Sequence, residues 1–239
     1  RAKNTGQGAG DMGGGGFVDE DGYLWINKCS VLENHTYNDA PYQVQERGGG
    51  HFGCKTNGHL FVTNNFISGG ATRGRGGVFY LTEDEDLLEQ AGYTNEIEIV
   101  NNLILDAGGR LTQTIHPAAG GTAFCGTSTT GRFENNTILG SYNEDATGGG
   151  SAILLQGATD FQVDNNIFVE CFSSNATARV VQNSVATTAN YNLFFRRNNG
   201  NFNANVTGDG NLVQNPWFAS GWDSDPDFVV MQMPWPVAV

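Results

Sequence analysis

The chain is poor in proline and in basic residues, and it contains no long apolar run. Six prolines occur among 239 residues, and 12 lysines and arginines stand against 25 aspartates and glutamates, for a formal net charge of −13. Such an acidic chain lacks the basic stripe that nucleic acid or an anionic membrane surface requires. No apolar run approaches the roughly 20 residues of a membrane-spanning helix. We therefore expect neither nucleic acid binding nor membrane insertion.

Helical periodicity is scarce as well. Apolar residues at the 3.6-residue spacing of an amphipathic helix are found only in the segment 83–91, which predicts at most a short helical turn in a loop. No proline- or serine-rich linker divides the chain, so we expect one domain over residues 1–239. These absences exclude a helical solenoid.

What the chain has in abundance is a repeated pattern of glycine and asparagine. Glycine occurs 34 times, and five Gly-Gly-apolar blocks are each followed by a block of the form apolar, Asn-Asn, apolar. The second asparagine falls at Asn65, Asn102, Asn136 and Asn166, with Asn192 in a degenerate copy. Repeats of a few tens of residues are typical of solenoids, in which each repeat buries its apolar face against its neighbours.

The apolar runs alternate with a period of two and are rich in β-branched and aromatic residues, which predicts strands. Between two strands, Asn-Asn suits a sharp corner, because asparagine tolerates the left-handed conformation and its amide can bond to nearby backbone. Stacked repeats place asparagine above asparagine, so we expect a ladder of side-chain amides. Its members are Asn65, Asn102, Asn136, Asn166 and Asn192.

This pattern resembles the right-handed parallel β-helix proteins of the pectin-lyase-like superfamily, whose T-shaped turns often carry asparagine. The glycine blocks are similar to repeats of β-helical surface proteins and autotransporter-like adhesins. The stretch from Asn211 to Val230 looks like the closing coil of such proteins, with Met233-Pro234-Trp235 in place of their Ser-Pro-Ala. The resemblance implies an all-β, single-domain, right-handed parallel β-helix of about six coils.

The spacing of the repeats predicts loop insertions. The ladder positions 65, 102, 136, 166 and 192 are separated by 37, 34, 30 and 26 residues, whereas a bare coil needs roughly two dozen. Insertions in solenoids are loops that often gather on a binding face. The segments expected to hold them are 33–47, 82–95, 106–119 and 141–147.

One segment is similar to a catalytic signature. Tyr23 to Ser30 resembles the Trp-Ile-Asp-His-Cys-Ser motif of pectate lyases, but Asn27 and Lys28 stand where that family has Asp and His. The same residues are explained as the first asparagine corner, with Asn27-Lys28 aligned on Asn64-Asn65. No cluster of aspartates recurs at the repeat spacing to hold the Ca²⁺ that such a lyase uses.

An enzyme on this fold would use other residues. For a lyase, the base and the charge-stabilising groups would come from Lys55, His59, Arg73, Arg75 and Arg110. A glycosidase needs two carboxylates roughly 5–10 Å apart, and stacking supplies the pairs Glu98/Glu134 and Glu134/Asp164. Solvated surface charge explains the same residues.

Candidate ligands and modifications lie mostly in expected loops. Ca²⁺ takes six to eight oxygen ligands, and the acidic run that offers them best holds Asp223, Asp225 and Asp227. Its spacing fits neither an EF-hand nor an RTX nonapeptide, so a solvated loop is the competing interpretation, and no other cofactor is indicated. Four N-x-Thr sequons are candidate glycosylation sites, at Asn34, Asn135, Asn175 and Asn205.

The four cysteines lack the short spacings of a zinc site. Alignment of the glycine blocks puts Cys54 and Cys125 two coils apart, about 9.6 Å, which is beyond disulfide reach. Buried thiols are the first interpretation, and disulfides through Cys29 or Cys171 are the alternative.

Three functional classes remain. We favour an extracellular or cell-surface structural or adhesive module without catalysis, a subunit of a surface, sheath or filament. Its uncapped strand edges predict self-association along the solenoid axis, or contact with further chain of the same protein. The alternatives are a secreted carbohydrate-active enzyme, either a polysaccharide lyase or a glycoside hydrolase, and a glycan-binding module that uses loop aromatics. Those aromatics are Tyr37, Tyr42, Tyr93 and Tyr142.

Overall fold

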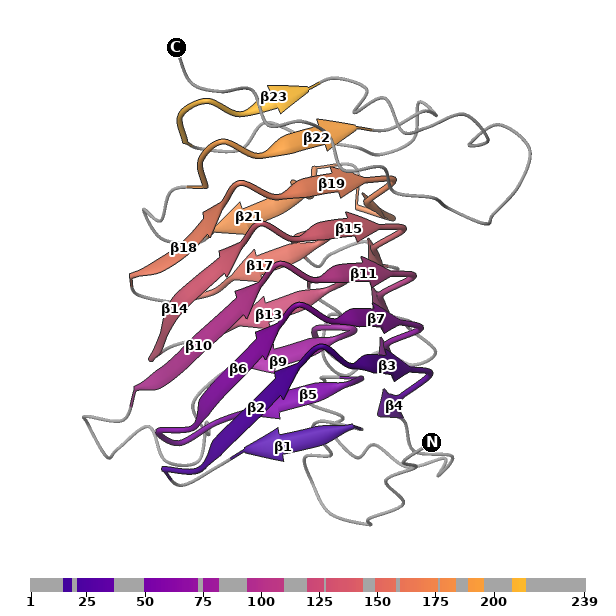
Figure 1. Cartoon of the computed structure of the whole chain (residues 1–239). Coiled ribbons are helices and arrows are strands. Elements are labelled where there is room, and N and C mark those ends of the chain that lie inside the picture. Colours follow the sequence, from indigo (N-terminus) through magenta and orange to yellow (C-terminus); the bar gives the residue numbers. More distant parts are fainter. Residues whose placement is uncertain are drawn as a thin grey trace.

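The computed structural model describes residues 15–18, 21–36, 50–72, 75–81, 94–109, 120–126, 128–143, 149–157, 160–175, 177–183, 189–195 and 208–213. Within these ranges the secondary structure is entirely β, and the strands form four sheets (Figure 1). The segment 83–91, expected to form a short helical turn, lies outside the described residues.

The chain passes through the four sheets in a fixed order, and we number the sheets in that order. Sheet I holds β1 (Gly16–Val18), β5 (Phe52–Cys54), β9 (Phe79–Leu81), β13 (Ala123–Cys125), β17 (Ile153–Leu155) and β21 (Val181–Asn183). Sheet II holds β2 (Tyr23–Asn27), β6 (His59–Thr63), β10 (Asn95–Val100), β14 (Thr129–Glu134) and β18 (Phe161–Asp164).

The other two sheets complete each circuit. Sheet III holds β3 (Ser30–Leu32), β7 (Phe66–Ser68), β11 (Leu103–Leu105), β15 (Thr137–Leu139), β19 (Ile167–Val169), β22 (Leu193–Phe195) and β23 (Leu212–Val213). Sheet IV consists of the two-residue strands β4 (His35–Thr36), β8 (Ala71–Thr72), β12 (Gly108–Gly109), β16 (Tyr142–Asn143) and β20 (Phe172–Ser173).

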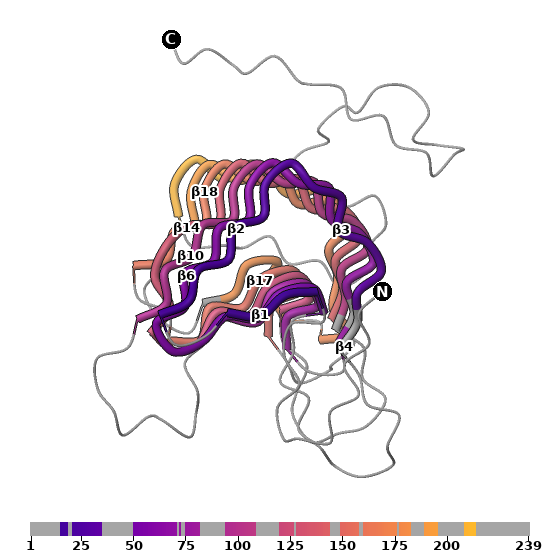
Figure 2. The backbone as a smooth tube through the Cα atoms, turned by 60° about the horizontal axis from the view of Figure 1, so that its bottom comes forward, coloured from indigo at the N-terminus to yellow at the C-terminus, as the bar shows by residue number. Residues whose placement is uncertain are grey.

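Every strand pairs in parallel with its equivalent one circuit away. Figure 2 shows the circuits lying one behind another when the molecule is viewed closer to its axis. This arrangement is a parallel β-solenoid, so the expected all-β solenoid class is confirmed.

Sheet IV was not expected from the sequence. Its strands His35–Thr36, Gly108–Gly109 and Tyr142–Asn143 lie within segments that the repeat spacing assigned to loops. The backbone of Gly108 shows why, because its N–H donates to the carbonyl of Gly70 at 2.9 Å in the preceding circuit. These strands form through pairing of backbone groups. A strand of two residues is too short to show an alternating side-chain pattern, so the sequence did not reveal it. The parts of the expected insertions at 37–47, 82–93, 110–119 and 144–147 lie outside the described residues.

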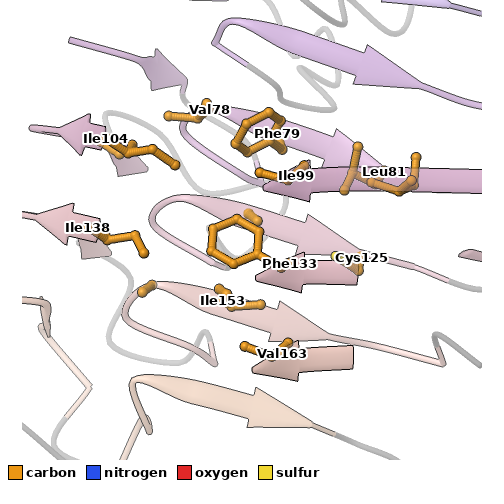
Figure 3. Packing of buried hydrophobic residues seen from close by; sticks show 14 of the residues in the cluster. Val78, Phe79, Leu81, Ile99, Ile104, Cys125, Phe133, Ile138, Ile153 and Val163 are labelled. Carbon is orange, nitrogen blue, oxygen red and sulfur yellow. The ribbon is translucent and has the colours of Figure 1, made fainter. Parts of the chain in front are cut away.

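Inward-facing residues of the first three sheets form one continuous core. Ile97 and Ile99 of β10 are fully buried, and a single apolar cluster runs from Val18 to Phe194. Figure 3 shows side chains from successive circuits filling the space between the sheets. Phe79 meets Phe133 edge-on at 6.4 Å between ring centroids, a favourable aromatic geometry.

Glycine is required where sheet IV turns into sheet I. Gly76 and Gly120 have φ of 69° and 67°, and a Cβ on Gly120 would lie 1.9 Å from the carbonyl oxygen of Ala123. A Cβ on Gly77 would lie 2.3 Å from the carbonyl oxygen of Gly121. Only glycine allows both the left-handed conformation and this approach of backbone to backbone.

The corner between sheets II and III is a two-residue turn with one exposed and one buried position. The first residue is left-handed, with φ of 59° at Asn64, 58° at Asn101 and 59° at Asn165. The second residue is asparagine in five circuits, with its side chain buried. These five are Asn65, Asn102, Asn136, Asn166 and Asn192.

The five buried asparagines stack and satisfy every polar group of their amides. The Asn102 Nδ2 donates to the carbonyl of Val62 at 2.8 Å and to the Asn136 Oδ1 at 3.0 Å. The Asn102 Oδ1 accepts from the backbone N–H and the Nδ2 of Asn65, at 2.9 and 3.0 Å. The pattern repeats up to Asn211, which accepts from the backbone N–H of Asn192 at 2.9 Å.

The start of the ladder corrects the alignment made from the sequence. Asn27 pairs with Thr63, so Lys28 and not Asn27 occupies the left-handed position, with φ of 55°. Cys29 therefore stands at the ladder position, where its backbone N–H donates to the Asn65 Oδ1 at 2.9 Å. The lyase-like segment is thus a corner of the stack, shifted by one residue from the expected register.

The ladder predicts a large effect of truncating one amide. We expect Asn102→Ala or Asn136→Ala to lower the free energy of unfolding by about 1–3 kcal/mol, because each leaves buried backbone groups without partners. The matched control is Asn101→Gly, at the adjacent exposed left-handed position, where glycine fits without strain. Urea denaturation measures all three. Equal midpoints for wild type and both alanine variants would show that the ladder is incidental.

Candidate functional site

The outer face of sheet II carries the most chemically varied side chains of the described residues. Because strands alternate inward and outward, the outward residues of successive circuits form columns along the solenoid axis. The first column reads Tyr23, His59, Glu96 and Thr130. The second column reads Trp25, Phe61, Glu98, Arg132 and Gln162.

Two aromatic side chains stand exposed at the β2 end of this face. Tyr23 and Trp25 are 73% and 72% exposed. The Tyr23 ring stacks on His59 with 4.2 Å between centroids and 2° between planes. Trp25 contacts Phe61 at 6.1 Å and 49°. We call this group of rings on the outer face of sheet II, with Tyr23 and Trp25 largely exposed, the aromatic ledge.

Charged residues adjoin this ledge in the next circuits. The His59 Nδ1 lies 2.9 Å from the Glu96 Oε2. Arg132 bridges two carboxylates, with its Nη2 3.1 Å from the Glu98 Oε1 and its Nη1 3.4 Å from the Glu134 Oε2. The face therefore passes from aromatic to charged along the axis.

The carboxylate pairs considered for a glycosidase, Glu98/Glu134 and Glu134/Asp164, have other interaction partners in the structure. Glu98 and Glu134 both form ion pairs with the single guanidinium of Arg132. Glu134 and Asp164 are neighbours in register, but the Asp164 Oδ1 accepts the backbone N–H of Asn190 at 2.8 Å. A glycosidase needs one carboxyl group as an acid and another as a base or nucleophile. In the described structure each of these carboxylates therefore has a hydrogen-bonding or ion-pair partner.

Two of the lyase candidates that the structure describes lie against different rings. Lys55 lies over the Phe17 ring at 5.8 Å, and Arg75 lies over the Phe124 ring at 4.8 Å. Those rings are three strands apart in sheet I, which separates them by about 14 Å. His59 lies on sheet II, where it is occupied by Tyr23 and Glu96. The remaining candidates, Arg73 and Arg110, lie outside the described residues.

The part of the chain that the structure describes contains no cluster of three or more histidine, cysteine or acidic residues able to hold a metal ion. The calcium candidates Asp223, Asp225 and Asp227 lie outside that part. Those same ranges also contain no helix long and apolar enough to cross a bilayer.

None of the four cysteines takes part in a disulfide. Cys54, Cys125 and Cys171 are buried and Cys29 is exposed. Leu81 separates Cys54 from Cys125 in the sheet I register, so the two lie two circuits apart as the glycine blocks indicated. Burial raises the pKa of the Cys125 thiol, because the thiolate would have no solvation in the core. The alternative of disulfides through Cys29 or Cys171 is wrong.

The sequons occupy different environments. Asn34 is buried, and its Nδ2 lies 2.8 Å from the His51 Nδ1. Asn135 is an exposed left-handed corner residue with φ of 56°. The Asn175 Oδ1 accepts from the Thr177 hydroxyl at 2.8 Å, and Asn205 lies outside the described residues. Among the described sequons, Asn135 is the most exposed.

Sequence reasoning did not single out the aromatic ledge. The aromatics proposed for glycan contact were in loops, and Tyr37, Tyr42 and Tyr93 lie outside the described residues. Tyr142 belongs to β16 and stacks on Phe172 at 5.7 Å. The available signal was the alternation in β2, which turns Tyr23 and Trp25 to the same face.

No protein-family model, no curated protein and no solved structure matches this chain. The function therefore has to be argued from the geometry of the described residues.

We expect no uronate lyase activity. Incubation with polygalacturonate or alginate, with and without Ca²⁺, should give no rise in the ultraviolet absorbance of unsaturated uronate. The physical reason is that Lys55 and Arg75 are held over separate rings, too far apart to act on one sugar. A rise in absorbance that Lys55→Ala or Arg75→Ala abolishes would contradict this prediction.

Proposed function

We propose that this chain is an extracellular or cell-surface structural or adhesive module, a subunit of a surface, sheath or filament without catalysis. In this proposal the solenoid is joined along its axis to a second copy or to further polypeptide of the same protein. One observation carries the proposal: among the described residues, the core of the solenoid is uncovered at both ends.

The β1 to β3 end leaves core residues open. Leu24 and Ile26 of β2 are only partly buried, although they face inward against the core. Their neighbours in β6, Leu60 and Val62, are fully buried. The difference comes from position alone, since no earlier circuit among the described residues covers the β2 side chains.

The β23 end shows the same feature. Val213 pairs with Phe194 and continues its inward column, yet Val213 is 68% exposed while Phe194 is fully buried. An exposed apolar residue at the end of a core column gains free energy when another circuit covers it. Open strand edges supply the backbone groups for that contact.

The polarity of the amide ladder favours head-to-tail contact. Each ladder amide donates its Nδ2 hydrogen to the Oδ1 of the next circuit, so the two ends of the ladder differ. Cys29 stands at one end and Asn211 at the other. Unlike surfaces that meet head to tail, without closure, build a filament.

We also propose that the solenoid is right-handed and belongs with the pectin-lyase-like β-helices. The support is the asparagine corner between sheets II and III, together with the general preference of parallel crossovers for the right hand. The surface-protein resemblance of the glycine blocks supports an extracellular location, where the sequon at Asn135 would make the protein a glycoprotein.

Sedimentation velocity at micromolar concentration tests the axial contact. We expect species larger than 25.6 kDa for the wild type, and a return to monomer for Val213→Lys, which places a charge on the open end. The matched control, Val100→Lys, makes the same change on the outer face of sheet II and should sediment like the wild type. A wild type that stays at 25.6 kDa at every concentration would refute the proposal.

Glycan binding without catalysis is the second candidate, and the aromatic ledge favours it. A pyranose ring has an apolar face that packs on an aromatic ring, while its hydroxyls bond to nearby polar groups. Tyr23 and Trp25 offer the open rings, and His59, Glu96 and Arg132 offer the polar groups. A few placed polar groups beside apolar contact area are typical of ligand sites.

Titration with a neutral oligosaccharide such as cellohexaose, followed by tryptophan fluorescence and calorimetry, tests this candidate. We expect millimolar or tighter binding that Trp25→Ala abolishes. Val100→Thr, on the same sheet but away from the rings, should leave the affinity unchanged. Equal heats for wild type and Trp25→Ala would rule out the ledge as the binding site.

A further inference from the structure

Tyr23 and Trp25 are the most exposed large hydrophobic residues among those that the structure describes, at 73% and 72%. They stand on the outer face of β2, two residues apart, so their Cα atoms are separated by about 7 Å. Behind each of them lies a ring of the next strand, His59 for Tyr23 and Phe61 for Trp25. The aromatic ledge therefore offers a ligand two neighbouring areas of ring surface.

The strands beside the ledge give the outer face of sheet II a negative charge. The five strands of this sheet carry four carboxylates and one guanidinium, which gives a formal charge of −3 with histidine counted as neutral. Arg132 pairs with both Glu98 and Glu134, so one positive charge serves two negative ones. Asp164 accepts from a backbone N–H, which carries no net charge. The face therefore has an excess of carboxylates that a cationic ligand would balance.

Two of these carboxylates lie in line with the ledge. Glu96 continues the column that begins with Tyr23, two strands further along the axis. Glu98 continues the column that begins with Trp25 in the same way. Figure 1 shows the three strands concerned, β2, β6 and β10, side by side. Each carboxylate therefore lies about 9.6 Å along the axis from the exposed ring of its column.

Both carboxylates have an oxygen available to a ligand. The contact with His59 uses the Glu96 Oε2, and the contact with Arg132 uses the Glu98 Oε1. The other oxygen of each carboxylate has no hydrogen-bond partner among the described residues. The side chains of Glu96 and Glu98 are 56% and 34% exposed, so a ligand on the outer face of the sheet can reach them.

We propose that the aromatic ledge, Glu96 and Glu98 together bind a polymer of amino sugars that lies along the solenoid axis. The proposal rests on the glycan-binding candidate described above and names the chemical class of its ligand. The apolar face of one sugar packs on the exposed rings of β2. The ammonium group of a sugar further along the polymer pairs with the carboxylates of β10.

The repeat of the sheet fits a linear sugar polymer. Successive strands are about 4.8 Å apart, and a sugar residue in an extended β-1,4-linked polymer has nearly the same length. A polymer along the axis therefore places one sugar over each strand, and its third sugar reaches β10 when its first lies on β2. Because every unit of an amino-sugar polymer carries an amine, an ammonium group meets the carboxylates whichever unit lies on the rings.

The charge of the face distinguishes this class of ligand from three others. An acidic polysaccharide brings further carboxylates to a face that already has an excess of them, and like charges repel. A neutral glycan makes the ring contacts but leaves the excess unbalanced. A lysine-rich peptide balances the charge, but it lacks the flat apolar face that a sugar lays on Tyr23 and Trp25. An amino-sugar polymer combines the flat apolar face with the positive charge.

Calorimetry with three oligosaccharides of equal length tests the proposal. They are the hexamer of β-1,4-linked glucosamine, which carries ammonium groups, and two uncharged hexamers, its fully N-acetylated form and cellohexaose. The titrations are made at low salt and at a mildly acidic pH, at which the amines and the carboxylates are both charged. We expect the glucosamine hexamer to bind about tenfold more tightly than either uncharged hexamer, because several individually weak ion pairs act together. Added salt should reduce this difference.

Variants separate the role of the carboxylates from that of the rings. Glu96→Gln combined with Glu98→Gln removes two charges and keeps side chains of the same shape, so the glucosamine hexamer should bind only as tightly as its N-acetylated form. The affinity for the uncharged hexamers should not change. Glu33→Gln combined with Asp106→Asn is the matched control, because it removes two carboxylates between sheets III and IV and should keep the preference. Trp25→Ala should abolish the binding of all three hexamers.

The outcomes distinguish this proposal from the candidate on which it rests. Equal affinities for the three hexamers, lost in Trp25→Ala, would overturn the amino-sugar assignment and leave glycan binding in place. An absence of binding to all three would overturn both. A preference for the glucosamine hexamer that persists in Glu96→Gln/Glu98→Gln would overturn the role of these carboxylates. A lysine hexapeptide that binds as tightly as the glucosamine hexamer would also overturn the proposal, since the site would then recognise charge alone.

Discussion

The structure depends on the amide ladder at the corner between sheets II and III. Each ladder amide spans one strand spacing and bonds to the circuits on both sides, so successive circuits must meet at the same height and in the same register. Asn102 shows the constraint, since its four side-chain hydrogen bonds join Val62, Asn65 and Asn136. A slip by one residue would reverse every inward and outward side chain and leave these buried groups unpaired.

Fixed register turns outward residues into columns whose chemistry is free to vary. On sheet II the columns carry rings and charges, and they end at the exposed side chains of Tyr23 and Trp25. On sheet III the columns are uncharged, with Leu103 and Ile167 partly exposed. One repeated core therefore presents two different surfaces, and two ends that no further circuit of the described residues covers. The activities proposed for this molecule all rest on these surfaces, and none requires a catalytic group.

The fold class could be predicted from the sequence because asparagine and glycine mark corners with specific backbone requirements. Sheet IV could not be predicted from the sequence, since Gly108–Gly109 is held by backbone pairing and carries no side-chain pattern. The first corner was misaligned by one residue because Cys29 bonds to the ladder through its backbone N–H, which any residue can supply. Whether Lys55 and Arg75 lie close together depends on how many circuits separate the rings that they contact, and the spacing of these residues in the sequence does not determine that. The only sequence signal for the exposed pair Tyr23 and Trp25 was the alternation of side chains within one strand, β2.

The most direct test of the ladder is the exchange rate of its side-chain amide hydrogens, measured by nuclear magnetic resonance on the intact chain. If the ladder holds the stack together, the Nδ2 hydrogens of Asn102 and Asn136 exchange orders of magnitude more slowly than those of the exposed Asn101, because the core must open to release them. Exchange of all three at the rate of a free asparagine amide would contradict this account of the fold.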